Sequence, residues 1–161
     1  ADSGDSIIVS PYKRPDTVLY SYSSSCYDHK QANCDKYGRL YTREAAMRIC
    51  PTGWHLPTKA EWMNLLFEAD ADYDSTLSYR LRATTTWTFT STVSDDRKDV
   101  VSFSALGSGG FWSGSFTAIG DQTYYWLPSE SSIMVITGHW YFTKGSTTSK
   151  YNQFPVRCIQ D

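Results

Sequence analysis

The four cysteines of this 161-residue chain constrain its fold more than any other feature. They are Cys26, Cys34, Cys50 and Cys158, and none belongs to a CxxC pair, which argues against a zinc ribbon or a thioredoxin-like site. An even number of cysteines in a chain rich in Tyr, Ser and Thr favours disulfides and an exported protein. The four allow three pairings, and four buried free thiols in a cytosolic protein are the alternative. A Cys26–Cys34 bond would close a local loop, whereas Cys50–Cys158 would tie the middle of the chain to its C-terminal part.

The length and charge of the chain exclude several classes of protein. A chain of 161 residues fits one domain, so we treat residues 1–161 as a single domain with an extended N-terminal segment over 1–25. The formal net charge is -2 and there is no run of Lys or Arg, so no basic surface is expected to attract nucleic acid. No apolar run approaches the roughly 18 residues of a membrane span. We therefore expect neither a nucleic-acid partner nor a membrane span in this chain, and the oligomeric state stays open.

Two helix signals stand in the first half of the sequence. In RLYTREAAMRIC, Thr42 is suited to cap a short helix that ends before Pro51. In LPTKAEW, Thr58 and Glu61 have the spacing of a capping box, which predicts a second helix at about 58–69. The apolar residues that then recur at helical spacing are Trp62, Leu65, Leu66 and Ala69.

Beyond residue 83 the sequence pattern changes from helical to extended. The stretch TTTWTFTSTV is alternating and β-branched, which is typical of a strand or an extended loop. The glycines of FSALGSGGFWSGSF predict a loop, and we also interpret SYSSSCYDHKQANCDKYG as a loop. Strands are predicted at TYYWLP, IMVITGHWYF and FPVRCIQ. Two helices followed by several strands favour an α+β fold.

The stretch CPTGWHLPTKAEW brings Cys50 close to His55, and a Cys–His pair is one way to activate a thiolate nucleophile. A cysteine in a disulfide cannot serve as that nucleophile, so we interpret the stretch as scaffold. His55 is then expected to make a structural hydrogen bond. We expect no catalytic residue here and no cofactor.

Metal binding has one weak candidate, the alternating acidic stretch EADADYD. Asp70, Asp72 and Asp74 resemble the opening of a calcium-binding loop. However, Ser75 stands where that loop has glycine, and Leu81 stands where it has a bidentate glutamate. We therefore interpret the stretch as the solvated acidic end of a helix and name no metal ligand, while a calcium site of another geometry stays open.

Aromatic and hydroxyl side chains are concentrated near the C-terminal end of the chain. Of the 34 residues over 121–154, 14 are Tyr, Ser or Thr, a mixture that provides rigid contact area and adaptable hydrogen bonds on binding surfaces. The alternative is a strand with one buried aromatic face and one polar outer face. We expect a loop-built ligand-binding face over about 105–150. Its expected ligand contacts are Trp112, Tyr124, Tyr125, Trp126, Trp140 and Tyr141.

The order of several motifs carries a resemblance to a known family. KYGRLYTREAAMRICPTGWHLPTKAEW resembles the core signature of the Fibrobacter succinogenes major paralogous domain, and VSFSALGSGG, YYWLPSES and FPVRCIQD follow in the order that the family has. The resemblance covers most of residues 26–161. That family is similar to the C-type-lectin-like fold and to formylglycine-generating enzymes, in which a segment resembles LPTKAEW.

The resemblance implies a specific α+β architecture. Two helices would pack on a twisted antiparallel sheet with long glycine-rich loops, and paired terminal strands would bring the N- and C-termini close together. A disulfide from the end of the first helix to the last strand is usual in that fold, which supports Cys50–Cys158 and therefore Cys26–Cys34. The calcium-lectin motifs EPN, QPD and WND are absent, so calcium-dependent sugar binding of that kind is not expected. The catalytic cysteine pair of the oxidases is not matched either.

These observations together lead to a functional expectation. We expect a non-enzymatic ligand-binding module, secreted or on a cell surface, of bacterial or phage-associated origin, with a glycan or protein ligand. The first alternative is a retroelement-diversified variable protein of the same fold that binds a receptor. An adhesin or structural subunit, which self-association would favour, is the second. An enzyme related to the formylglycine-generating oxidases is the third, and a free, accessible thiol would favour it.

Overall fold

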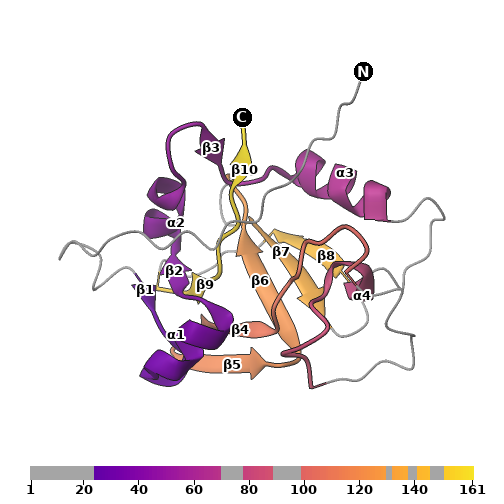
Figure 1. Cartoon of the computed structure of the whole chain (residues 1–161). Helices are drawn as coiled ribbons and strands as arrows, with labels where there is room; N and C mark the ends of the chain where they lie inside the picture. Colours follow the sequence, from indigo (N-terminus) through magenta and orange to yellow (C-terminus); the bar gives the residue numbers. More distant parts are fainter. Residues whose placement is uncertain (1–23, 70–77, 89–98, 130–131, 138–140, 146–150) are drawn as a thin grey trace.

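The structure is a computed structural model, and it describes residues 24–69, 78–88, 99–129, 132–137, 141–145 and 151–161 (Figure 1). The helices are η2 (Tyr27–His29, a 3-10 helix), α1 (Gln31–Tyr37), α2 (Arg43–Ile49), α3 (Lys59–Ala69) and α4 (Ser78–Leu81). The strands are β1 (Ser24–Ser25), β2 (Leu40–Thr42), β3 (Trp54–His55), β4 (Ser108–Trp112), β5 (Ser115–Ile119), β6 (Gln122–Trp126), β7 (Ser132–Thr137), β8 (Tyr141–Gly145), β9 (Gln153–Phe154) and β10 (Ile159–Gln160). Helices gather in the first half of the chain and strands in the second, as an α+β fold requires.

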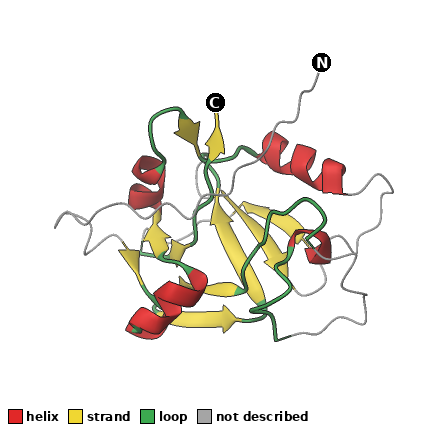
Figure 2. Ribbon diagram, viewed as in Figure 1, coloured by secondary structure: helices red, strands yellow, loops and turns green. Residues whose placement is uncertain are grey.

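The strands form one large and one small sheet (Figure 2). The large sheet has eight strands in the order β1-β2-β9-β4-β6-β7-β8, and β5 pairs with β4 outside this path. Its pairs are antiparallel except for β4 and β6, which meet in parallel where Gly109 lies opposite Thr123. In the small sheet β10 pairs antiparallel with β3, so Ile159 lies opposite His55. The last strand thus holds the connection between α2 and α3 in place.

Both predicted helices are confirmed, and local capping explains where each begins. The Thr42 side chain accepts a hydrogen bond from the backbone N–H of Ala45 at the start of α2. At the start of α3, the Glu61 N–H donates to the Thr58 hydroxyl, and the Thr58 N–H donates to the Glu61 carboxylate at 2.8 Å. These bonds satisfy backbone donors that have no partner within the first turn of a helix.

The hydrophobic core lies on both faces of the β6–β7 pair. Successive side chains of a strand point to opposite faces, so a strand covered on both sides buries every residue. On the face toward α3 and α4, the buried cluster contains Trp62, Leu65, Leu66, Ala69, Leu81, Phe103, Ala105, Tyr125, Leu127, Met134 and Ile136. On the face toward α2, it contains Ala46, Leu56, Tyr124, Trp126, Ile133, Val135 and Phe154. The β6–β7 pair is therefore the central layer of the molecule.

The glycine-rich stretch FSALGSGGFWSGSF, which predicts a loop, instead contains the β4–β5 hairpin, so that prediction was wrong. Phe111 lies opposite Phe116 in the antiparallel register, and the two-residue turn between the strands is Ser113–Gly114. Both turn residues have positive φ, as the type I′ turn favoured in hairpins requires. Glycine is needed within β4 because a Cβ on Gly110 would lie 2.7 Å from Cδ1 of Phe154. Gly110 therefore allows β4 to pack closely against Phe154, and it does not mark a flexible loop.

Other element boundaries also differ from the predictions. The predicted loop over 21–38 contains η2 and α1 in its described part, and FPVRCIQ is divided between β9 and β10, which join different sheets. IMVITGHWYF is divided between β7 and β8, which pair with each other. Of TTTWTFTSTV, residues 84–88 are not in a strand, and the remainder lies outside the described residues. The N-terminal strand that the resemblance implies, and with it the proximity of the termini, concerns residues 1–23, which lie outside the described part.

Two disulfides join the four cysteines in the pairing that the family resemblance implied. Cys26 bonds Cys34 across eight positions, and Cys50 bonds Cys158 across 108 positions. Cys50 caps the end of α2, and Cys158 directly precedes β10, so the second bond connects the helical half to the end of the chain. The structure thus contains no free thiol among its four cysteines, all of which are described.

Candidate functional site

Three of the expected ligand contacts belong to the core, which is a correction to the expected binding face. Tyr124, Tyr125 and Trp126 are consecutive residues of β6 and are 9%, 2% and 1% exposed. Their side chains alternate between the two buried clusters, and the indole N–H of Trp126 donates to the backbone carbonyl of Tyr41 at 2.7 Å. A ligand on the surface does not reach these rings, because both faces of β6 are covered.

The other three expected contacts have different outcomes. Trp140 lies outside the described residues, and Tyr141 is described only through its backbone, which pairs with Ile136 in the β7–β8 hairpin. Trp112 ends β4 and is half-buried, with its ring centroid 5.2 Å from that of Phe154 and 5.8 Å from that of Tyr124. The core therefore anchors one part of the Trp112 ring, and the remainder is accessible at the surface.

The β4–β5 hairpin carries further aromatic side chains that sequence reasoning did not single out. Phe111 and Phe116 are half-buried and face each other across the hairpin, with ring centroids 5.0 Å apart. The exposed His29 ring meets Phe116 edge-on at 5.0 Å. We call the set His29, Phe111 and Phe116 the aromatic hairpin; Trp112 follows Phe111 in β4, so it points to the opposite face and packs on Phe154. The signal that marks it in the sequence is the pattern FWSGSF, in which aromatics flank a Ser-Gly turn.

Several contacts hold the aromatic hairpin in position. The buried Asn152 side chain accepts a hydrogen bond at 2.9 Å from the backbone N–H of Ser113 in the turn. Phe111 lies opposite Gln153 of β9, and the Gln153 side chain accepts a hydrogen bond from the Ser25 hydroxyl. Tyr151, which precedes Asn152, is 67% exposed. The hairpin is thus fixed at both its turn and its strand, which limits the entropy lost on binding.

The backbone beside the hairpin adopts an unusual conformation. Asp28 and His29 both have positive φ, at 52° and 56°. Residues other than glycine rarely adopt this region, and such strain concentrates at sites of function. The His29 ring that follows this backbone lies edge-on to the Phe116 ring. Aromatic faces with adjacent polar groups suit the C–H faces and hydroxyls of a sugar.

His55 makes structural hydrogen bonds, as expected. Its Nδ1 lies 2.6 Å from a carboxylate oxygen of Asp161, and its Nε2 lies 3.0 Å from a carboxylate oxygen of Glu61. The hydrogen bond with Asp161, followed by that with Glu61, raises the pKa of His55 above its ordinary value of 6.5. Burial raises the pKa of Glu61, but hydrogen bonds from Thr58 and His55 outweigh it and lower the pKa below 4.5. His55 therefore links α3 to the end of the chain.

This link predicts a pH-dependent contribution of His55 to stability. Because the folded-state pKa is raised, the contribution is complete below pH 6.5 and is lost as the pH rises through the raised pKa. The Glu61 carboxylate stays ionised in this range. We expect the wild type to have a higher melting temperature than His55→Gln. The difference between the two melting temperatures should be largest near about pH 5.5 and should become smaller toward about pH 8.5. Thermal denaturation followed by circular dichroism measures this difference, and a difference that grows with pH would contradict the assignment.

The candidate calcium ligands cannot be placed, because Asp70, Asp72 and Asp74 lie outside the described residues. Within the described part of the chain, no group of three or more His, Cys, Asp or Glu side chains is arranged to hold a metal ion. The aromatic hairpin is accordingly the site on which the functional proposal is built. It consists of aromatic and imidazole groups.

Comparison with known proteins places the chain in a family. The model of the Fibrobacter succinogenes major domain matches residues 5–160, which is nearly the whole chain. Neither a curated protein nor a solved structure matches the chain significantly. The match includes the signature around Cys50 and Trp54, the hairpin residues and the C-terminal motif, in agreement with the resemblance drawn from the sequence. The chain belongs to the Fibrobacter succinogenes major domain family.

Proposed function

We propose that this domain is a non-enzymatic, secreted or surface-displayed module that binds a glycan through its aromatic hairpin. One observation carries the proposal: the partly or fully accessible rings of His29, Phe111 and Phe116 gather at one face of a fixed hairpin, with the Phe116 ring 5.0 Å from each of the other two. A platform of a few rings suits the apolar face of a sugar, whereas a stable protein interface buries about 800 Å² on each partner. A protein ligand is the second possible outcome of the binding experiment below.

The disulfides support the proposed localisation. Both bonds need an oxidising compartment in which to form and persist, as in secreted and surface proteins. Every helix in the described residues is too short or too polar to cross a bilayer. The bacterial or phage-associated origin expected from the sequence remains part of the proposal.

The cysteine pairing also supports binding over thiol chemistry. A thiolate is the reactive form of cysteine, and a cysteine in a stable disulfide has none to offer. All four cysteines are paired, so an oxidase mechanism that uses a free thiol would first require reduction of one of these bonds. Thiol titration of the denatured, unreduced protein distinguishes the two classes: no reactive thiol is expected, and free thiols would favour the enzyme.

We propose further that the fold is a variant of the C-type-lectin-like fold. Its support is the placement of α2 and α3 against opposite faces of the β6–β7 pair, together with the disulfide that connects the end of α2 to the last strand (Figure 1). The aromatic hairpin lies far from α3 and packs against η2, which contributes His29 (Figure 1).

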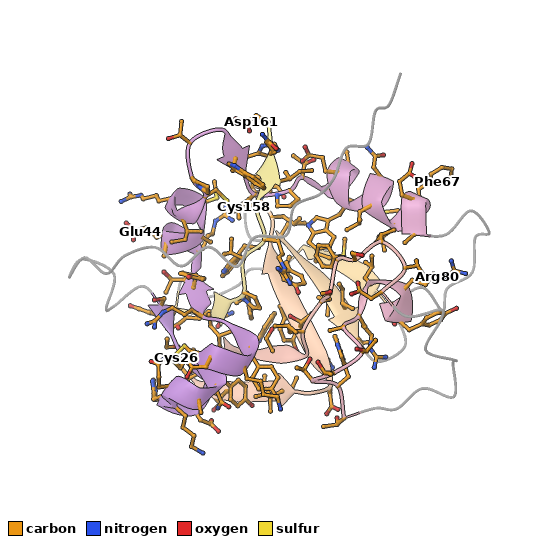
Figure 3. The ribbon with its side chains drawn as sticks, in the orientation of Figure 1. Cys26, Glu44, Phe67, Arg80, Cys158 and Asp161 are labelled. Carbon is orange, nitrogen blue, oxygen red and sulfur yellow. A yellow bond between two sulfur atoms is a disulfide. The ribbon has the colours of Figure 1, made fainter. Side chains whose placement is uncertain are left out.

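A glycan array followed by titration tests the proposed function. We expect the labelled domain to bind a restricted set of glycans, and Phe116→Ala to weaken binding about tenfold or more, because aromatic anchors dominate binding energy and the Phe116 ring contacts both His29 and Phe111. Phe67→Ala is the matched control, since Phe67 is 65% exposed and projects from the end of α3, far from the hairpin (Figure 3). This control should bind like the wild type.

Three results would change the proposal. Equal losses in Phe116→Ala and Phe67→Ala, or no loss in either, would remove the hairpin from the ligand site. Capture of a surface protein with no glycan bound on the array would replace the glycan by a protein ligand. Concentration-dependent self-association in light scattering would instead favour a structural subunit.

A further inference from the structure

Gln153 lies beside the aromatic hairpin and extends it with a polar side chain. β9 pairs antiparallel with β4 and places Gln153 opposite Phe111, while β5 places Phe116 opposite Phe111 from the other side. The side chains of directly opposite residues in neighbouring strands share one face of a sheet. Phe116, Phe111 and Gln153 therefore form one row across β5, β4 and β9, which we call the cross-strand row.

The contacts of β4 show on which face of the sheet this row lies. A Cβ on Gly109 would lie 2.9 Å from Cε2 of Tyr27, whereas a Cβ on Gly110 would meet the buried ring of Phe154. Gly109 and Phe111 are two positions apart in the strand, so both point to the side of Tyr27. The cross-strand row thus lies on the face where η2 packs, opposite the core cluster that contains Phe154.

The carboxamide of Gln153 has unused hydrogen-bond donors at the surface. Its oxygen accepts a hydrogen bond from the Ser25 hydroxyl at 2.5 Å, whereas its Nε2 has no hydrogen-bond partner within the described part of the chain. Gln153 is half-buried, and Nε2 is not among the fully buried side-chain atoms that lack a partner, so solvent reaches this nitrogen. A carboxamide nitrogen carries two N–H donors. A ligand on the cross-strand row can therefore accept a hydrogen bond from Gln153.

Ser25 holds this carboxamide from the edge of the sheet. β1 pairs with β2, and β2 pairs with β9, so the Ser25 hydroxyl reaches Gln153 across the intervening strand. The next residue, Cys26, is bonded to Cys34, which ties the end of β1 to α1. A side chain that is already held loses less conformational entropy when a ligand binds. Ser25 thus prepares Gln153 for a ligand without belonging to the row itself.

The chemistry of the cross-strand row suits an uncharged ligand. Phe116, Phe111, Gln153 and the supporting Ser25 carry no charge, and carboxylates are bound most strongly by cationic donors. A hydroxyl group both donates and accepts hydrogen bonds, as a carboxamide does. Neighbouring strands lie about 4.8 Å apart, so a hydroxyl of a sugar ring stacked on Phe111 can reach the adjacent Gln153.

We propose that Gln153 is the specificity-determining polar residue of the glycan site, and that the ligand is an uncharged pyranoside. One sugar ring stacks on Phe111 beside Phe116, and one of its hydroxyl oxygens accepts a hydrogen bond from Nε2 of Gln153. Ser25 is a positioning residue that acts through Gln153. This inference rests on the proposed function, because it assigns a polar contact and a ligand class to the same hairpin.

Nuclear magnetic resonance of the ¹⁵N-labelled domain tests the proposal through the side-chain amide signals. Cellobiose, maltose and lactose serve as probes, and the spectrum of Gln153→Met identifies the Gln153 signals by their absence. We expect at least one sugar to shift the Gln153 side-chain signals and the backbone signals of Phe111 and Phe116 with one common dissociation constant. Gln153→Met should raise that constant about fivefold, the loss expected for one neutral hydrogen bond. Gln160→Met, at an exposed glutamine of β10, should bind like the wild type.

A second pair of variants tests the positioning role of Ser25. Ser25→Ala should move the Gln153 side-chain signals in the free domain and raise the dissociation constant about twofold, because the carboxamide loses its hydrogen bond. Ser25→Thr retains the hydroxyl and should restore both the signals and the affinity. Thermal denaturation shows that each variant is folded. Unchanged Gln153 signals and wild-type affinity in Ser25→Ala would exclude this role.

The outcomes distinguish the role of Gln153 from the hairpin site itself. Saturable shifts of Phe111 and Phe116 without a Gln153 shift, or wild-type affinity of Gln153→Met, overturn the inference and leave the hairpin site. A saturable Gln153 shift while Phe111 and Phe116 stay unmoved overturns the hairpin site and the stacked sugar ring. No Gln153 shift with any of the three sugars overturns the inference, and a shift with glucuronic acid alone assigns the row to anionic sugars instead.

Discussion

Replacement of both Cys50 and Cys158 by serine should lower the free energy of unfolding by about 4.7 kcal/mol. The bond closes a loop of 108 positions, and the chain-entropy model assigns about this value to a loop of roughly 100 residues. The loss is comparable with the entire stability of many small domains, about 5–15 kcal/mol. Urea denaturation of the oxidised protein and of the double variant, compared at the same pH, measures it.

The second disulfide provides the matched control. Replacement of Cys26 and Cys34 by serine opens a loop of only eight positions, for which the same model gives about 2.5 kcal/mol. We therefore expect the Cys50/Cys158 variant to be the less stable of the two by about 2 kcal/mol. Equal losses, or a larger loss from the short loop, would show that loop closure is not how the long-range bond stabilises the fold.

Trp126→Ala should cost about 3–5 kcal/mol of stability, the usual range for truncating a large buried aromatic residue. The Trp126 ring is 1% exposed and packs 4.8 Å from the ring of Phe154. Its truncation leaves a cavity and also leaves the carbonyl of Tyr41 without the indole donor. Urea denaturation of Trp126→Ala and of Trp112→Ala tests this. Because Trp112 is only half-buried, its replacement should lower the free energy of unfolding clearly less than that of Trp126.

Comparison of Trp126 with Phe116 also separates core from ligand site. Trp126→Ala is expected to act on stability, whereas Phe116→Ala is expected to act mainly on binding. If Trp126→Ala kept the wild-type stability and yet lost the ligand, the β6 aromatics would return to the binding face. In that event the buried placement of Tyr124 and Tyr125 would be in question as well.

The helices and their caps were predictable because their signals are local. Thr42 caps α2, and Thr58 with Glu61 caps α3, through bonds between residues three positions apart. The spacing of Trp62, Leu65 and Leu66 then fixed which face of α3 is buried. The disulfide pairing was not predictable from spacing alone, and it followed from the family resemblance, which the family match over 5–160 confirms.

The candidate site was less predictable because it depends on contacts between distant residues. The run YYW has the composition of a binding face, and it is buried because α2 and α3 cover opposite faces of β6. No pattern within the β6 sequence indicates that helices cover both faces of this strand. Likewise Gly110 resembled a loop residue, but its missing Cβ makes room for Phe154, more than 40 positions further along the chain. His29 joins the aromatic hairpin only through folding.

Hydroxyl-radical footprinting with and without the glycan selected on the array measures directly whether the aromatic hairpin is the ligand face. The ligand should slow oxidation of Phe111 and Phe116, because bound sugar covers their accessible edges. Phe67, which is exposed on α3, should be oxidised at the same rate in both samples. Protection of Phe67 with unchanged oxidation of Phe111 and Phe116 would contradict the assignment and place the ligand on α3 instead.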